Sequence, residues 1–334
     1  MASLEPFIGE GAALLAALLW AAATLMFGQL GKRLSPLVLN IAKGVIAIAL
    51  MGLTLALQYG LMQNAASLTL PALSVTLLIL SGAFGIGLGD TAYFSAINAL
   101  GARKALLLET LAPPIATILA WIFLSESLSL LAISGITLTL LGVAWVISER
   151  VPGSNAQQNK AGLYIALLAT FCQAVGAVLS RAALAQTNVS PLWSSLIRLC
   201  AGLVFMFLLI LCRPQYLQHP GRLNNRGLDA EKLGSTSSEP IGQLWKQILL
   251  PFRSLRLLGG VVIASFFATY LGIWLQQVAL KYTETGIAQA LLATSPLFVI
   301  PMVIVLGERV TWRSVAGVVI ALIGVWLLIG NAFT

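Results

Sequence analysis

The sequence predicts an all-α membrane protein with ten transmembrane helices arranged as two inverted five-helix repeats. Three observations lead to this fold class. Hydrophobic residues make up 59% of the 334 residues and charged residues only 9%, whereas about a quarter of the residues of a soluble domain are charged. Ten apolar segments are about long enough to cross a bilayer, and the second half of the chain repeats motifs of the first half at a fixed spacing.

A membrane-spanning helix needs about 20 apolar residues. The predicted spans are residues 11–29, 36–58, 74–98, 104–124, 129–148, 161–185, 192–212, 256–281, 286–306 and 313–330. Short connections join most of them, so consecutive helices are expected to run antiparallel. The exception is the polar stretch 213–255, which holds His219, the sole histidine. The first ten residues contain two acids and no base, so we expect the first segment to stay as a span and not to be cleaved as a signal peptide.

The distribution of basic residues predicts the orientation in the membrane. When Lys43 and Arg198, which lie well inside spans, are left out, 15 Lys and Arg fall on the side of the stretch 213–255 and 2, Arg181 and Lys281, on the other. Without the long loop and the adjoining Arg256 the split is still 8 to 2. Because short cytoplasmic loops are enriched in Lys and Arg, we predict a multi-pass protein of the cell (inner or plasma) membrane with a cytoplasmic long loop and both termini outside.

The two halves of the chain share an ungapped pattern. Residues 112–143, "APPIATILAWIFLSESLSLLAISGITLTLLGV", align with residues 294–325, "TSPLFVIPMVIVLGERVTWRSVAGVVIALIGV". The identities, all 182 residues apart, are Pro114 with Pro296, Glu126 with Glu308, Gly135 with Gly317, and Gly142 with Gly324. A Ser-Pro pair also opens the second span of each half, and a basic residue follows seven positions after each proline, Lys43 in one half and Arg198 in the other.

These matches divide the chain into a first repeat, 1–150, and a second repeat, 161–330, interrupted by the polar loop 213–255. Each repeat has five spans, an odd number, so the second must be inverted in the membrane relative to the first. Inverted repeats are the architecture of secondary transporters, whose substrate site lies near the midplane between the halves.

The doubled pattern "P…LxE…G…GV", together with the "SP…K/R" opening of the second helix in each half, resembles the EamA-type drug/metabolite transporter superfamily. The resemblance covers nearly the whole chain outside 213–255. It implies a ten-helix exporter or exchanger of small metabolites, such as amino acids or related solutes, that works by alternating access. We expect a monomer or homodimer without a cofactor.

Four ionisable residues lie well inside predicted spans: Lys43, Asp90, Glu109 and Arg198. Each costs at least about 2.5 kcal/mol there unless it is paired or hydrated. Counting the helical rise from the cytoplasmic ends puts the first three at similar depths, where they could meet. Either an acid here carries a coupling proton that Lys43 releases by pairing, or Lys43 and one acid form a static ion pair and Glu109 snorkels to the interface. The repeat requires neither acid, because Gly272 and Leu291 stand at the corresponding positions.

Lys43 and Arg198 recur at the same place in both halves, and two interpretations remain open for them. They could be paired cationic positions, one serving each access state, that attract a carboxylate or phosphate of the solute. Alternatively, each caps backbone carbonyls or anchors at the headgroups.

Glu126 and Glu308 each precede a new helix, so we expect their carboxylates to satisfy free N–H groups at its start, with a gate role as the alternative. Prolines such as Pro114 and Pro296 remove backbone donors inside the membrane, which predicts that the fourth and ninth spans line the central cavity. Polar candidates for its lining are Tyr93, Asn98, Thr110, Gln173, Tyr270, Gln276, Gln277, Gln289 and Thr294.

Enzymatic activity is not expected. Gly87-Leu88-Gly89-Asp90 spells the GxGD of intramembrane aspartyl proteases, but such an enzyme needs two acids that share a proton, and the only other aspartate, Asp229, lies in the polar loop. A single histidine leaves no metalloprotease motif, so no metal site is predicted. Dispersed basic residues argue against nucleic-acid binding. The rival class is a membrane scaffold or channel-like subunit.

Overall fold

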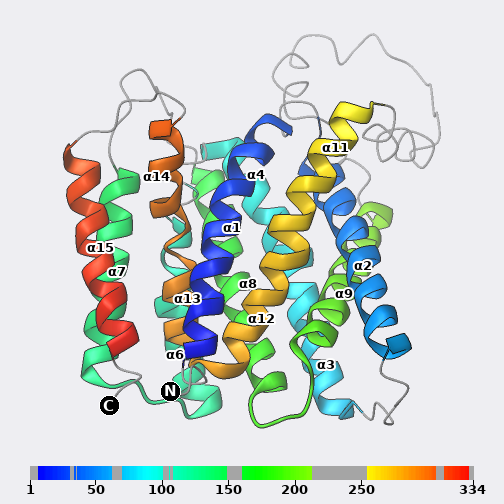
Figure 1. The fold of residues 1–334 in the computed structure, drawn as a ribbon, viewed down its shortest axis with the longest axis horizontal. Helices are drawn as coiled ribbons and strands as arrows, with labels where there is room; N and C mark the ends of the chain where they lie inside the picture. Colours follow the sequence, from blue (N-terminus) through cyan, green and yellow to red (C-terminus); the bar gives the residue numbers. More distant parts are fainter. Residues whose placement is uncertain are drawn as a thin grey trace.

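The computed structural model describes residues 7–30, 34, 36–61, 70–100, 105, 108–148, 160–212, 254–305 and 312–330, and these residues form helices and turns with no strand. Single long helices are α1 (Ile8–Leu30), α2 (Pro36–Leu61), α7 (Leu130–Ser148), α8 (Lys160–Leu184), α9 (Pro191–Cys212) and α15 (Trp312–Gly330). They stand roughly side by side with the remaining helices (Figure 1). The all-helical prediction is therefore confirmed for the described residues.

Two further elements change their helical winding midway. α3 (Ala72–Ser81) continues through the π-helical segment η2 (Gly82–Gly89) into α4 (Asp90–Leu100). In the same way α11 (Leu255–Ala264) continues through η6 (Ser265–Leu271) into α12 (Gly272–Tyr282). π-Helical turns are rare and often occur at functional sites. No pattern in the amino-acid sequence indicated these two segments.

Two other elements contain a proline-flanked turn. A turn at Thr110 and Leu111 precedes α6 (Ala112–Leu124), whose first residues include Pro113 and Pro114. A turn at residues 293–294 separates α13 (Thr285–Leu292) from α14 (Ser295–Val305), which begins with Ser295 and Pro296. Proline is favoured at the first position of a helix because its missing N–H would have no partner there.

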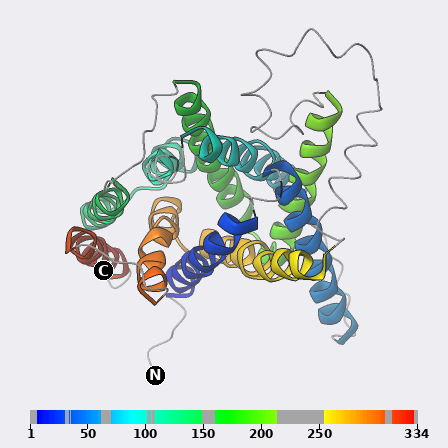
Figure 2. The same ribbon diagram turned by 90° about the horizontal axis from the view of Figure 1, so that it is seen from above.

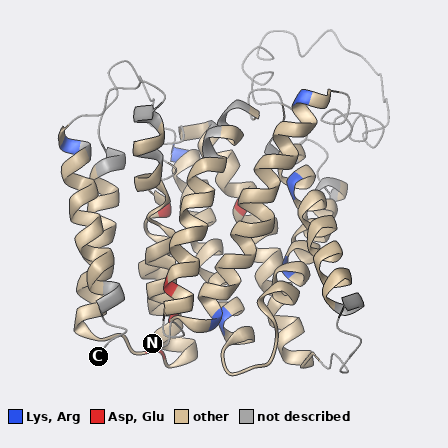
Figure 3. Cartoon of the chain, in the orientation of Figure 1, with Lys and Arg blue, Asp and Glu red and all other residues tan. Residues whose placement is uncertain are grey.

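By length and composition, five of the described helical stretches can cross a membrane: Val38–Gln58, Ala72–Ile97, Lys160–Leu184, Pro191–Leu209 and Leu255–Tyr282. Shorter apolar helices cover Ile8–Ala23, Ala112–Leu124, Leu130–Trp145 and Val315–Leu327. Charged residues are sparse along the helices (Figure 3). Many large apolar side chains point outward, for example Trp121, which is 65% exposed. This surface is suited to contact with lipid and not with water.

Helix bounds recur at a nearly constant distance along the chain. α7 and α15 begin and end 182 residues apart, as do α4 and α12. The two π-helical segments begin 183 and end 182 residues apart. This is the spacing at which the proline, glutamate and glycine motifs match in the sequence.

α7 and α15 lie side by side (Figures 1 and 2) and meet through glycines. A Cβ built on Gly142 would collide with the carbonyl oxygen of Gly317, and one built on Gly324 would collide with that of Gly135. Residue numbers rise along α7 as they fall along α15, so the two helices are antiparallel. The contact is reciprocal, as in a two-fold interface. The 182-residue offset relates Gly142 to Gly324 and Gly135 to Gly317, so it converts one of these two contacts into the other.

α1 begins and α15 ends at the same end of the bundle, while α9 ends and α11 begins at the opposite end (Figure 1). We call these the terminus end and the loop end. The segment 213–253 that joins α9 to α11 falls outside the described residues, as do the ends of the chain.

Candidate functional site

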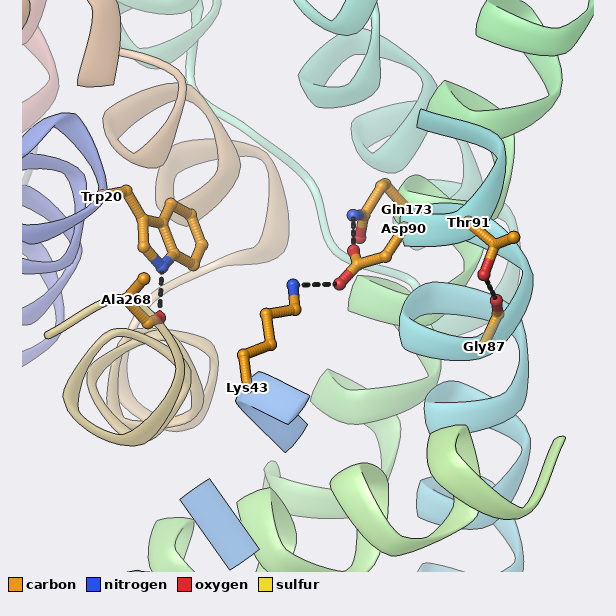
Figure 4. Close-up of polar contacts among 7 residues, drawn as sticks. All are labelled: Trp20, Lys43, Gly87, Asp90, Thr91, Gln173 and Ala268. Atoms are coloured by element: carbon orange, nitrogen blue, oxygen red, sulfur yellow. Dashed lines mark hydrogen bonds and ion pairs between the residues drawn. The ribbon is translucent and has the colours of Figure 1, made fainter. Parts of the chain in front are cut away.

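An ion pair inside the bundle joins α2 to the start of α4. Lys43 Nζ donates to Asp90 Oδ2 over 3.0 Å, and the Gln173 amide of α8 donates to Asp90 Oδ1, also over 3.0 Å. Lys43 and Gln173 approach the carboxylate from different helices (Figure 4). The Lys43 and Asp90 side chains are only 12% and 19% exposed. Lys43 Nζ also lies 5.0 Å from the centroid of the Phe94 ring, so an aromatic face adds to its stabilisation.

The glycine-rich segment η2 brings three helices together beside this pair. A Cβ on Gly82 would strike the backbone of Arg198 on α9, and one on Gly85 would lie 3.7 Å from the Cα of Gly176 on α8. A Cβ on Gly89 would lie 3.4 Å from the Cβ of Cys172, also on α8. Small residues allow helices to approach closely, so these glycines let α8 and α9 place their polar side chains near Asp90.

Glu109 and Tyr93 extend the cluster. A side-chain hydrogen bond links the two residues, and the Glu109 carboxylate is near enough to Asp90 for their charges to repel. The expectation that Lys43, Asp90 and Glu109 could meet is thus met in part: Lys43 pairs with Asp90, and Glu109 bonds to Tyr93 nearby.

Arg198 lies within electrostatic range of Asp90. Its side chain reaches toward η2, where a Cβ on Gly85 would lie 3.3 Å from Nη2. Nη1 donates to Gln276 Oε1 of α12 over 3.3 Å. Lys43 and Arg198 therefore interact with the same carboxylate and do not occupy separate regions of the bundle. We call Lys43, Asp90, Tyr93, Glu109, Gln173, Arg198 and Gln276 the central cluster.

Tyr270 and Gln277 lie outside the central cluster. The Tyr270 hydroxyl bonds with Thr54 Oγ1 at 2.8 Å, and its ring packs in an apolar cluster with residues of α2 and α9. Gln277 is fully buried and accepts a hydrogen bond from Ser194 on α9 over 2.7 Å. Both residues thus join helices in this structure.

The position that corresponds to Asp90 in the other half is occupied differently. Gly272 begins α12 as Asp90 begins α4, and a Cβ built on it would collide with the Trp20 indole. Trp20 Nε1 donates to Ala268 O over 2.8 Å (Figure 4). The indole of α1 therefore fills the space at Gly272, and a carboxylate has no room there.

At the terminus end, Glu126 connects the two halves. Arg181 Nε donates to Glu126 Oε1 over 2.7 Å, and Thr285 N donates to Oε2 over 2.9 Å. The prediction that Glu126 caps the next helix in sequence, α7, is therefore wrong, because Glu126 caps α13. The start of α7 is capped by Ser129, whose hydroxyl accepts from Ala132 N. The start of α13 lies close enough to supply a free N–H group, which the sequence order could not reveal.

Arg181 and Lys281 bind backbone carbonyls at the same end of the bundle. The sequence indicated only the side of the membrane on which they lie. Arg181 Nη1 donates to the carbonyl oxygens of Leu280 and Lys281 over 3.0 and 2.8 Å, which satisfies the last turn of α12. Lys281 Nζ donates to Val189 O over 2.7 Å. The Glu126–Arg181 pair could have been predicted from the sequence only in that both residues were expected on the outer side of the membrane.

Threonine hydroxyls satisfy a backbone carbonyl at each proline-flanked break. Thr170 of α8 donates to Leu108 O over 3.2 Å, just before the turn that precedes α6. Thr294 Oγ1 donates to Leu291 O within the turn before α14. Thr110 and Gln289 are buried beside these turns. Glu308 and the Asn98 side chain lie outside the described residues, and the described residues contain no group of three acids, histidines or cysteines suited to a metal.

Comparison with known proteins identifies one family. The model of the EamA-like transporter family matches residues 7–148 and 233–330. One solved structure, described only as a crystal structure of a protein, superposes with a TM-score of 0.68 at 16% identity, covering 96% of this chain and 95% of its own. At this identity the likeness concerns the fold alone. No curated protein matches the chain.

Proposed function

Because the chain belongs to the EamA-like transporter family, within the drug/metabolite transporter superfamily, we propose that this membrane transporter is a secondary carrier. It exports or exchanges small metabolites, such as amino acids or related solutes, by alternating access. The proposal includes ten spans in two inverted repeats, 1–150 and 161–330, no catalytic activity of its own, and a monomeric or homodimeric state.

The reciprocal glycine contact between α7 and α15 is the observation that carries the proposal. An antiparallel two-fold contact between segments 182 residues apart is what an inverted repeat produces. The paired π-helical segments and paired proline-flanked turns support it as well. In secondary transporters the site lies between such halves, at discontinuous helices. The central cluster adjoins η2, α12 and the turn before α6.

We assign the coupling role to Asp90 and Lys43. Asp90 is held by one cation and one amide, so protonation of the carboxylate would weaken both bonds and free Lys43. A proton taken up by Asp90 on one side and released on the other couples the solute to a proton gradient. A static ion pair is the competing interpretation, and it predicts transport that does not depend on protonation of Asp90.

The proposed location of the protein is the cell membrane, inner or plasma, with both termini outside and the loop 213–255 in the cytoplasm. α1 begins and α15 ends at the terminus end, whereas α9 ends and α11 begins at the loop end (Figure 1). This arrangement supports termini and loop on different sides of the membrane. The excess of basic residues supports the direction. This orientation is tested by adding a single cysteine at either terminus of the protein and labelling it in intact cells.

Two steps test the transport function. Metabolite profiling of the medium, from cells that overproduce or lack the protein, identifies candidate solutes. Flux of each solute into sealed vesicles is then measured against concentration, with protein-free vesicles as the control. A carrier predicts saturable flux, whereas flux that rises linearly without limit would support a channel-like subunit instead.

A further inference from the structure

The central cluster contains two basic residues, Lys43 and Arg198. Lys43 pairs with Asp90, whereas no carboxylate of the described residues lies at bonding distance from the Arg198 guanidinium. We propose that Arg198 is the anion-binding residue of the transport site and that it holds the carboxylate of the solute. This inference rests on the transport function proposed above and adds a substrate class to it: small solutes that bear a single carboxylate.

The burial of Arg198 gives the first argument. The residue is 2% exposed. Among the described residues, its Nε has no hydrogen-bond partner, and Nη1 donates to the neutral oxygen of Gln276 over 3.3 Å. A buried donor on a charged group costs free energy when it is unsatisfied. A carboxylate that accepts from the guanidinium would remove this cost, because the two groups match in planar, bidentate geometry.

The contrast with Lys43 gives the second argument. Lys43 Nζ is already bonded to Asp90 over 3.0 Å, while Arg198 is only within electrostatic range of that carboxylate. A solute anion at Lys43 would have to displace Asp90, whereas one at Arg198 would not. The two basic residues at corresponding positions of the repeats thus have different roles: Lys43 pairs with the coupling acid, and Arg198 binds the solute.

The backbone around Arg198 is held in place by glycines. Gly82 of η2 packs directly on the Arg198 carbonyl, and Gly202 of α9 packs on Ile86 and on the Gly82 carbonyl. A side chain at Gly82 would push α9 away. Close packing of this kind holds the backbone that carries the guanidinium before a ligand arrives, which lowers the entropic cost of binding.

The charges of the central cluster favour a carboxylate over a phosphate ester. The Lys43 and Asp90 charges offset one another, which leaves the positive charge of Arg198 and the Glu109 carboxylate, hydrogen-bonded to Tyr93. A dianionic phosphate would add a second negative charge to a poorly hydrated region that already contains two acids, and excess buried charge is costly. A monoanion adds only one negative charge, which the Arg198 guanidinium can bind directly because no carboxylate of the described residues lies at bonding distance from it.

Acetate is the probe that tests this assignment without knowledge of the solute. The unfolding temperature of the purified full-length protein in detergent is measured against acetate, acetamide, chloride and phosphate at constant ionic strength. Acetate raises this temperature for the wild type because binding stabilises the folded state, while acetamide and chloride do not. In Arg198→Gln the apparent acetate affinity falls by about 10- to 100-fold, the loss expected for a charged hydrogen bond.

Two further variants complete the test. Arg256→Gln makes the same change at the exposed start of α11 and keeps the wild-type response. Arg198→Lys keeps the charge without the planar fork and shows weakened acetate binding, so it decides the matter where the Gln variant does not fold. The inference is overturned by a wild type that does not respond to acetate, by unchanged affinity in either Arg198 variant, or by a larger response to phosphate. Because no transport is measured, vesicle flux can succeed where the acetate test fails, and the reverse.

Discussion

Lys43 Nζ lies 3.0 Å from Asp90 Oδ2, which makes an ion pair between residues of two different helices that are 47 positions apart in sequence. In a membrane interior such a pair removes two isolated charges at once. The second Asp90 oxygen accepts from Gln173, so the carboxylate is held from two sides by two different helices.

The first prediction concerns the energy of this pair. Lys43→Gln and Asp90→Asn each leave a charged partner uncompensated and lower the free energy of unfolding by about 1–3 kcal/mol. The double variant loses less than the sum of the two, because neither charge remains. Unfolding of all four proteins in detergent gives the coupling energy. Additive losses would mean that the pair contributes nothing.

The second prediction concerns coupling. Asp90→Asn abolishes accumulation of solute driven by a pH gradient, because the amide cannot take up and release a proton, while exchange of solute for solute partly survives. Both activities are measured in proteoliposomes with and without an imposed gradient. Asp90→Glu, which keeps a carboxyl group, is the control. Accumulation by Asp90→Asn equal to that of the wild type at every pH would rule out the coupling role.

The third prediction concerns the contact between α7 and α15. Gly142→Ala and Gly324→Ala each place a methyl group against a backbone carbonyl of the opposite helix, so each lowers the free energy of unfolding by about 1–3 kcal/mol. Their effects are similar because the contact is reciprocal. Gly52→Ala is the matched control, since nothing lies within 4 Å of the added Cβ. Equal stability of all three variants would contradict the close approach of these helices.

The fourth prediction concerns Glu284, between α12 and α13. Burial raises the pKa of Glu284, the nearby Glu126 raises it further, and Arg181 opposes them. With a folded pKa above the unfolded value, the group favours folding below the unfolded pKa, and this contribution is lost as the pH rises through the folded pKa. Glu284→Gln therefore stabilises the protein near pH 7 and has little effect near pH 4. Unfolding temperatures across this range check the prediction; a stabilisation independent of pH would contradict it.

Sequence reasoning located the helices well but could not predict how several of them are wound or paired. Apolar runs define helix positions directly, so most described helices begin and end within a few residues of the predicted spans, whereas the predicted spans 104–124 and 286–306 are each broken by a turn. The π-helical segment η2 coincides with the close approach of α8 and α9 to its glycines, a tertiary contact that the sequence does not reveal. In the same way, the choice of Thr285 as the partner of Glu126 depends on how the two halves pack.

The candidate site was predictable in its members and not in its geometry. Buried charge in an apolar span is visible in the sequence, and this identified Lys43, Asp90, Glu109 and Arg198. The bonds of Gln173 to Asp90 and of Gln276 to Arg198 depend on which face of α8 and α12 is turned inward. Polar residues that join helices, such as Tyr270 and Gln277, have the same sequence signature.

Counterflow in proteoliposomes tests the central claim, alternating access, most directly. Vesicles are loaded with a high concentration of the unlabelled solute identified by metabolite profiling, and a trace of labelled solute is added outside without any ion gradient. The account predicts a transient accumulation of label above its equilibrium level, because the site returns loaded from either side. Label that only equilibrates, at a rate independent of the internal solute, would contradict it.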